Sequence, residues 1–194
     1  MAEAIINFIK PHLAKNHLEI EFRLGKRNGT YFDTNIGKDN FEKIYRRLCR
    51  YPGWDSVSTQ KTSVFYGTRK GLRVVYDEEK DEQVSCISKY NVANMDQVLE
   101  NQPLDVRISV SIENPATYDA DRDVFTHERK RTRTSFVRKG LSIDASVVET
   151  SDKDSENALG YQIELEIVEP HLDLDDVKIA NHYQKVFDVL KLLN

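Results

Sequence analysis

Two short segments near opposite ends of the chain alternate carboxylates with large aliphatic residues. Glu19 and Glu21 stand two residues apart in the first segment, and Glu164 and Glu166 stand two residues apart in the second. Because successive side chains of a β-strand point to opposite faces, each pair would present both carboxylates on one face. Carboxylates that converge from two strands offer the hard oxygen ligands that Mg²⁺ and Mn²⁺ prefer. If the two strands meet, the sequence predicts a divalent metal site.

A basic pattern has the same period of two. Arg129, Arg131, Arg133 and Ser135 share one face of a strand that we predict over 123–138, and the opposite face is polar too, so we expect that face to lie in solvent. Taken alone, such a basic run is more typical of a solvated strand or a localisation signal than of an active site. Arginines aligned on one face nevertheless match the geometry of phosphate oxygens.

Most other predicted strands also separate polar from apolar residues. For any single strand, a sandwich with its polar face in water is the simpler interpretation. Considered together, the strands tend to carry one sign of charge each, which indicates walls that face one another inside a closed barrel. Besides the segments above, the polar faces carry Arg23, Arg73, Lys89, Arg107, Glu113 and Asp144.

A charged lumen is costly unless its charges compensate one another or bind a ligand. The acids and bases on these faces nearly balance, so an ion network is feasible, although stability alone would favour aliphatic residues. Arginines bind phosphate oxygens, and clustered carboxylates repel one another until they hold a cation. The two requirements together predict a polyphosphate ligand beside a divalent metal ion.

The elements that position these residues follow from periodicity and from turn residues. Helical spacing predicts helices over 2–13 and 38–50, and a C-terminal helix that Asp173 caps. We expect an α+β fold, mainly β: a closed antiparallel eight-stranded β-barrel, or tunnel, with a charged interior and with helices packed outside. A polar loop is expected at 151–157, and strands are predicted over 18–24, 30–36, 62–66, 71–77, 82–90, 105–113, 123–138, 141–148 and 160–168.

Composition limits the class of protein. The 194 residues suit one domain with a real core, and we expect a single domain over 1–194. A net charge of −4 argues against a protein that coats nucleic acid. Cys49 and Cys86 are too few for a disulfide framework or a zinc site. No apolar run has the length of a transmembrane helix or of a signal peptide core, so we expect an intracellular protein.

The order of the motifs resembles a known family. Four motifs follow one another: Glu-x-Glu from Glu19, Arg-x-Ser-x-Ser-x-Glu from Arg107, Arg-x-Arg-x-Arg from Arg129 and Glu-x-Glu from Glu164. In this order they resemble the metal-dependent RNA 5′-triphosphatases of fungi, protozoa and large DNA viruses. These enzymes are triphosphate tunnel metalloenzymes of mRNA capping, and the small chain is most similar to the stand-alone enzyme of chlorella viruses. The chain departs from the fungal pattern at Arg131, where those members tend to have lysine.

The resemblance implies hydrolysis of the γ-phosphate of 5′-triphosphate RNA, which leaves a 5′-diphosphate end, and NTP hydrolysis with Mn²⁺. It implies Mg²⁺ or Mn²⁺ as cofactor, held by Glu19, Glu21 and Glu166 with Glu164 in or beside the ligand set. Glu113 would lie near the attacking water and Asp144 would orient the basic residues. The remaining candidates are Arg73, Lys89, Arg129, Arg131 and Arg133 for catalysis, and Arg23, Arg107 and Ser135 for substrate binding.

The expected partners are the 5′ end of nascent RNA and NTPs, with a separate guanylyltransferase as a candidate protein partner. We expect a monomer that does not associate with membranes, located in the host nucleus or cytoplasm if the chain is viral.

Two alternatives remain open. Inorganic tripolyphosphatases, thiamine triphosphatases and class IV cyclases share the tunnel, but they favour lysine at the position of Arg23. A non-catalytic phosphate-binding barrel would need the arginines but has little use for four carboxylates. Tyr66 and Tyr76 are interpreted as packing residues, and His127 as an edge residue without a catalytic role.

Overall fold

The structure is a computed structural model that describes residues 2–150, 158–169 and 174–194. The predicted loop at 151–157 and the predicted cap Asp173 therefore lie outside the described residues. In chain order the elements are α1 (Ala2–Ile9), η1 (Lys10–His12), β1 (Leu18–Asn28), β2 (Tyr31–Asp33), α2 (Lys38–Arg50), β3 (Ser56–Gly67), β4 (Leu72–Asp77), β5 (Glu82–Gln97), β6 (Asp105–Pro115), β7 (Phe125–Arg138), β8 (Leu141–Thr150), β9 (Ala158–Ile167), α3 (Asp176–Leu190) and η2 (Lys191–Leu193).

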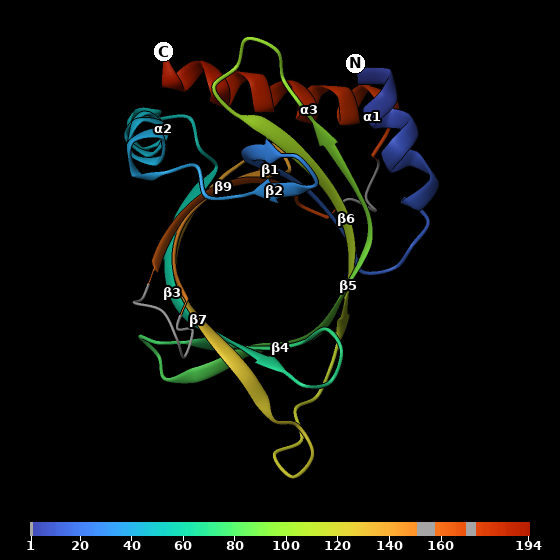
Figure 1. Cartoon of the computed structure of the whole chain (residues 1–194), viewed down its shortest axis with the longest axis vertical. Coiled ribbons are helices and arrows are strands. Elements are labelled where there is room, and N and C mark those ends of the chain that lie inside the picture. Colours follow the sequence, from blue (N-terminus) through green and yellow to red (C-terminus); the bar gives the residue numbers. More distant parts are fainter. Residues whose placement is uncertain (1, 151–157, 170–173) are drawn as a thin grey trace.

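The strands form one antiparallel sheet that closes on itself. Around the ring the order is β1, β6, β5, β4, β3, β7, β8 and β9, and β9 pairs again with β1, whereas the short β2 extends only the end of β1. Figure 1 looks along this ring and shows α1, α2 and α3 outside it. The prediction of a closed eight-stranded barrel with external helices is confirmed, and the open sandwich is excluded because the first and last strands pair.

The closing contact between β1 and β9 is short, and we call it the seam. It brings the two Glu-x-Glu segments side by side, as the sequence analysis required for a metal site. The register pairs Glu21 with Glu166, Phe22 with Leu165 and Arg23 with Glu164.

The apolar core lies between the outer face of the barrel and the helices. Ile20 and Phe22 of β1 point outward and are fully buried, together with Ile5 of α1, Ile44 of α2 and Ile179 of α3. Burial of apolar surface is the main favourable term in folding, at roughly 25 cal/mol per Å². Because the helices supply this burial outside the barrel, the inner face is free to carry charge.

Local sequence explains where the helices begin and end. Pro11 follows α1, and the regular helix gives way to η1 at Lys10, short of the predicted end at residue 13. At the start of α3 the side chain of Asp175 accepts a hydrogen bond of 2.7 Å from the backbone N–H of Lys178, so Asp175 is the capping residue. No helix in the described ranges is long and apolar enough to cross a membrane.

A β-bulge interrupts β5, which is longer than the predicted strand over 82–90. The register with β6 shifts between Asn91 and Ala93. An extra residue in one strand reverses which positions face inward. Lys89 therefore faces the lumen before the bulge, and Asp96 faces it after the bulge, although their numbers differ in parity.

Candidate active site in the tunnel

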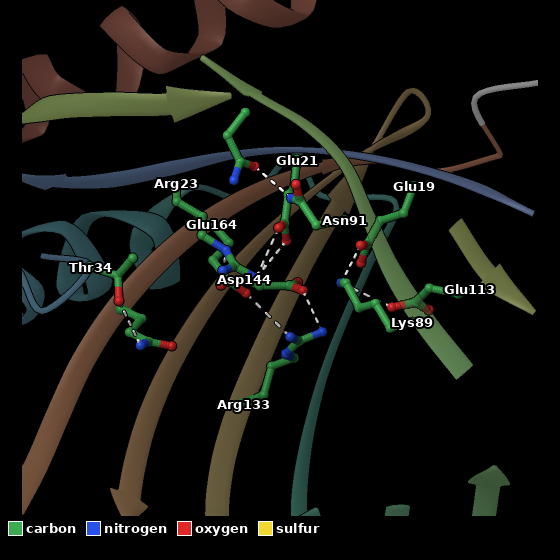
Figure 2. Close-up of polar contacts among 12 residues, drawn as sticks. Glu19, Glu21, Arg23, Thr34, Lys89, Asn91, Glu113, Arg133, Asp144 and Glu164 are labelled. Carbon is green, nitrogen blue, oxygen red and sulfur yellow. Dashed lines mark hydrogen bonds and ion pairs between the residues drawn. The ribbon is translucent and has the colours of Figure 1, made fainter. Parts of the chain in front are cut away.

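Lys89 joins the first of two ion-pair clusters on the inner wall (Figure 2). Its Nζ contacts the carboxylate of Glu19 and lies 3.0 Å from Oε1 of Glu113, its register partner on β6. The Lys89 side chain is only 9% exposed. Burial opposes the charged form, but Glu21, Glu19 and Glu113 outweigh it and raise the pKa of Lys89. The ammonium group is therefore held charged inside the barrel.

Two arginines join the second cluster. Arg23 places Nη2 2.8 Å from Oε1 of Glu21 and Nε 2.8 Å from Oε1 of Glu164, across the seam. Arg133 of β7 lies 2.9 Å from Asp144 and 3.3 Å from Glu164. Although burial raises the pKa of Glu164, the neighbouring Arg23 and Arg133 outweigh it and hold that pKa below its usual value. Figure 2 shows these side chains converging from β1, β7, β8 and β9.

Glu19 and Glu166 are short of positive charge. Burial, followed by the charge of Asp144, raises the pKa of Glu166 to about 7. Burial, followed by the charge of Glu21, raises the pKa of Glu19 to about 8 despite the contact with Lys89. Within the described residues Glu166 has no ion pair, and its register partner on the seam is another acid, Glu21. This wall would be stabilised by an added cation.

The carboxylates fit a divalent cation in chemistry, but their present contacts are with basic side chains. Across the described part of the chain, no three His, Cys, Asp or Glu side chains stand close enough to hold a metal ion together. Lys89 instead contacts Glu19, and Arg23 contacts Glu164. The donors are all carboxylates, which suit Mg²⁺ and Mn²⁺, and among the residues that the structure describes Glu166 has no basic partner at ion-pair distance. Metal binding would exchange ion pairs for metal–oxygen bonds.

Whereas those carboxylates are short of positive charge, the arginines farther along the tunnel are short of negative charge. Arg73, Arg129 and Arg131 point to the inner face, and in the described residues none of them has a carboxylate at ion-pair distance. The Nε atom of Arg131 is buried without a hydrogen-bond partner in the same residues. Burial, followed by the nearby charge of Arg133, lowers the pKa of Arg131 to about 10. A buried guanidinium without an anion is costly, so this wall would be stabilised by an anionic ligand.

An aromatic pair accompanies two of these arginines at one end of the barrel, and we call the four residues the entrance cluster. Tyr66 near the end of β3 and His127 near the start of β7 are stacked with ring centroids 4.2 Å apart and planes 6° apart. The Cζ atoms of Arg73 and Arg129 lie 5.3 and 5.4 Å from the Tyr66 centroid. From the sequence, Tyr66 was predicted to be a packing residue and His127 an edge residue. Tyr66 in fact lies on the same inner face as the arginines of β7.

Two predicted substrate-binding residues lie apart from the unpaired arginines. Arg107 makes a two-pronged ion pair with Asp96, with distances of 2.6 and 2.8 Å, and its Cζ lies 4.8 Å from the centroid of the Phe32 ring. Ser135 is half-buried opposite Asp144 in the ladder between β7 and β8. Asp96 was not predicted because the strand predicted over 82–90 ends before the bulge, beyond which β5 continues to Gln97.

Comparisons with known proteins identify the family to which this chain belongs. A family model described as mRNA capping enzyme, beta chain, matches residues 35–194. The match begins after β1, so the first Glu-x-Glu pair is not part of it. The mRNA-capping enzyme subunit beta of Schizosaccharomyces pombe is 24% identical over 112 residues, which are 56% of this chain and 37% of that relative. The chain thus matches well under half the length of this relative.

Solved structures share the fold over nearly the whole chain. The RNA triphosphatase Pct1 of S. pombe superposes with a TM-score of 0.82 at 20% identity, covering 99% of this chain and 91% of that one. The mimivirus capping enzyme triphosphatase gives a TM-score of 0.66 at 14% identity, covering 100% of this chain and 96% of that one. With a family model that matches most of its residues, the chain belongs to the family of the mRNA capping enzyme beta chain.

Proposed function

We propose that this chain is a metal-dependent RNA 5′-triphosphatase that hydrolyses the γ-phosphate of 5′-triphosphate RNA during mRNA capping. The observation that carries the proposal is the division of charge in the tunnel. Arg131, Arg129 and Arg73 have no carboxylate partner in the described residues. Glu166 has no ion pair there either, and the pKa of Glu19 stays raised despite its contact with Lys89. A triphosphate accompanied by a divalent cation supplies what each wall lacks. Membership of the capping family supports the same activity.

The unpaired arginines are suited to binding the phosphate groups. In phosphoryl transfer the charge of the transition state lies on the phosphoryl oxygens, so catalysis rests on positioning and on neutralising that charge. Arg131 and Arg133 point toward the same lumen as Lys89 and would share this role. Glu19, Glu21, Glu164 and Glu166 would hold Mg²⁺ or Mn²⁺, which supplies further neutralisation of the phosphate oxygens when it is bound.

Glu113 is the candidate for contact with the attacking water. Its side chain is 32% exposed, more than those of Glu19 and Lys89, and Lys89 fixes its position. A carboxylate so placed can orient water and accept its proton, which typically contributes a factor of about 10² to 10⁴ in rate. Asp144 instead acts as a positioning residue, because it pairs with Arg133 and accepts a 2.6 Å hydrogen bond from Ser142.

The proposed substrates are the 5′ end of nascent RNA and NTPs, and the proposed protein partner is a separate guanylyltransferase. The capping role places the protein in the nucleus or the cytoplasm. A viral origin, the likeness to the chlorella virus enzyme and the monomeric state stay predictions.

The proposal is tested by release of γ-phosphate from triphosphate-ended RNA in the presence of Mg²⁺ or Mn²⁺. Glu19→Ala and Glu166→Ala should abolish release while circular dichroism shows an intact fold. Lys130→Ala is the control, since Lys130 lies on the solvent-facing side of β7 and is exposed. Full activity in either glutamate variant, or no release by the wild type with either metal, would refute the proposal.

The same assay distinguishes the other tunnel enzymes. An inorganic tripolyphosphatase or a thiamine triphosphatase would turn over tripolyphosphate or thiamine triphosphate in preference to RNA ends. A non-catalytic barrel would bind triphosphate-ended RNA equally well with a chelator present and would release no phosphate.

A further inference from the structure

The entrance cluster lies where the nucleoside end of a triphosphate would emerge from the tunnel. Arg133, which contacts the carboxylate Glu164, is separated from His127 by six residues along β7. At the rise of a β-strand this separation is about 20 Å along the strand. If the γ-phosphate lies among the carboxylates, as the proposed function requires, the remaining phosphates, the ribose and the base extend toward Tyr66 and His127.

Holding the two arginines in place accounts for Tyr66 but not for His127. The Tyr66 ring holds Arg73 and Arg129 near the lumen by cation–π contacts. His127 contacts neither arginine in this way. Its ring lies parallel to Tyr66, is exposed to solvent, and has Nδ1 3.0 Å from the hydroxyl of Thr126. The imidazole therefore extends the aromatic stack outward and presents a flat surface to solvent.

We propose that Tyr66 and His127 form a stacking platform for the base of the first nucleotide. Stacked aromatic side chains are the usual means by which proteins bind single-stranded nucleic acid without sequence preference, because every base has a π face. Arg73 and Arg129 beside the platform would bind the phosphates that precede the base. The platform gives the enzyme a preference for nucleotide ends over inorganic tripolyphosphate, with little discrimination among the four bases.

The test compares ligands with and without a base, and separately compares proteins with and without the His127 ring. ATP and ribose 5′-triphosphate share the phosphates and the sugar and differ only in the base. Each is used as a competitive inhibitor of γ-phosphate release from triphosphate-ended RNA, and the two inhibition constants are compared. The variants are His127→Ala, which removes the ring, and His127→Phe, which keeps a ring and removes its nitrogens. Lys130→Ala on the opposite face of β7 is the matched control.

With the wild type, ATP should inhibit about tenfold more strongly than ribose 5′-triphosphate, as expected for one stacked base. His127→Ala should make the two inhibition constants equal, whereas His127→Phe and Lys130→Ala should keep the tenfold ratio. The platform is wrong if the wild type shows equal constants or if His127→Ala leaves the ratio unchanged. Absence of phosphate release from RNA by the wild type would instead refute the proposed function, so the two failures are distinguishable.

Discussion

Arg131 is the residue at which the charge of the tunnel is least balanced. It has a buried Nε without a partner in the described residues, and its pKa is lowered by burial and by Arg133. Natural proteins retain such unfavourable groups where a ligand needs them, so function and stability oppose each other at this position. The alternation on β7 predicted that Arg131 faces the lumen, but sequence could not predict that Arg133 has carboxylate partners and Arg131 has none.

Replacing Arg131 should separate the two effects. Arg131→Met removes the charge but keeps much of the volume, so we expect kcat/KM for γ-phosphate release to fall about 10²- to 10³-fold. The same change should raise the free energy of unfolding by about 1 kcal/mol, because an unpaired buried charge is removed. Kinetics and urea denaturation measure the two quantities. A loss of stability would show that Arg131 supports the fold.

The raised pKa of Glu19, about 8, predicts how the metal-free protein responds to pH. The folded protein keeps a proton on Glu19 at pH values where the unfolded chain has lost it, so stability present at low pH is lost as pH rises toward 8. For Glu19 alone, at about 1.4 kcal/mol per pH unit, we expect the free energy of unfolding in a chelator to fall by about 3 kcal/mol between pH 5.5 and pH 8. Glu19→Gln should flatten this decrease, and an equal slope in the variant would contradict the assignment.

At the scale of elements, the bulge in β5 decides which residues reach the tunnel. Alternation predicted the inward positions of β1, β7 and β9 because those strands pair without interruption along their motif residues, the register shift of β7 against β3 lying before residue 127. It failed for Asp96, since the register shift between Asn91 and Ala93 has no signature in the alternating pattern. The first half of β3 was missed for another reason. Residues 56–61 lack apolar alternation and form a strand because β7 offers hydrogen-bond partners.

The bulge has a measurable consequence at Asp96, which it turns toward Arg107. Asp96→Asn weakens a two-pronged ion pair that is largely shielded from solvent, so the free energy of unfolding should fall by about 1 kcal/mol. Urea denaturation measures this loss. Inhibition of phosphate release by tripolyphosphate should stay unchanged if Arg107 serves only the fold. Stronger inhibition in the variant would mean that the freed Arg107 reaches phosphate, as the sequence analysis expected.

The whole molecule inverts the common arrangement of a small barrel, with its apolar core outside and its charges inside. Apolar residues of β1, β6, β8 and β9 form one core with those of α1, α2 and α3. Figure 1 shows the three helices outside the ring. The sequence predicted this arrangement because the helices and the strands each have one apolar face. The charges on the inner walls of the barrel are only partly balanced by opposite charges, so the stability of the barrel should depend on its ligands.

Metal and triphosphate should therefore stabilise the protein together. A ligand that binds only the native state at 100 times its Kd adds about 2.7 kcal/mol to stability. We expect tripolyphosphate with Mn²⁺ to raise the melting temperature by several degrees, and by more than either alone, because each neutralises the wall that the other leaves charged. Differential scanning fluorimetry measures the shift. Glu166→Ala should lose the contribution of Mn²⁺, and an unaltered shift in this variant would place the metal elsewhere.

The shortness of the seam has a consequence for how the chain folds. Only three register pairs join the first barrel strand to the last, so nearly the whole chain must be ordered before a few hydrogen bonds repay the entropy of closing it. One of these pairs joins two acids, Glu21 and Glu166, which repel each other when no cation is bound. Closure is thus the most non-local event in folding, and an early release of these pairs during unfolding would separate the carboxylates of β1 from those of β9 while most of the sheet remained intact.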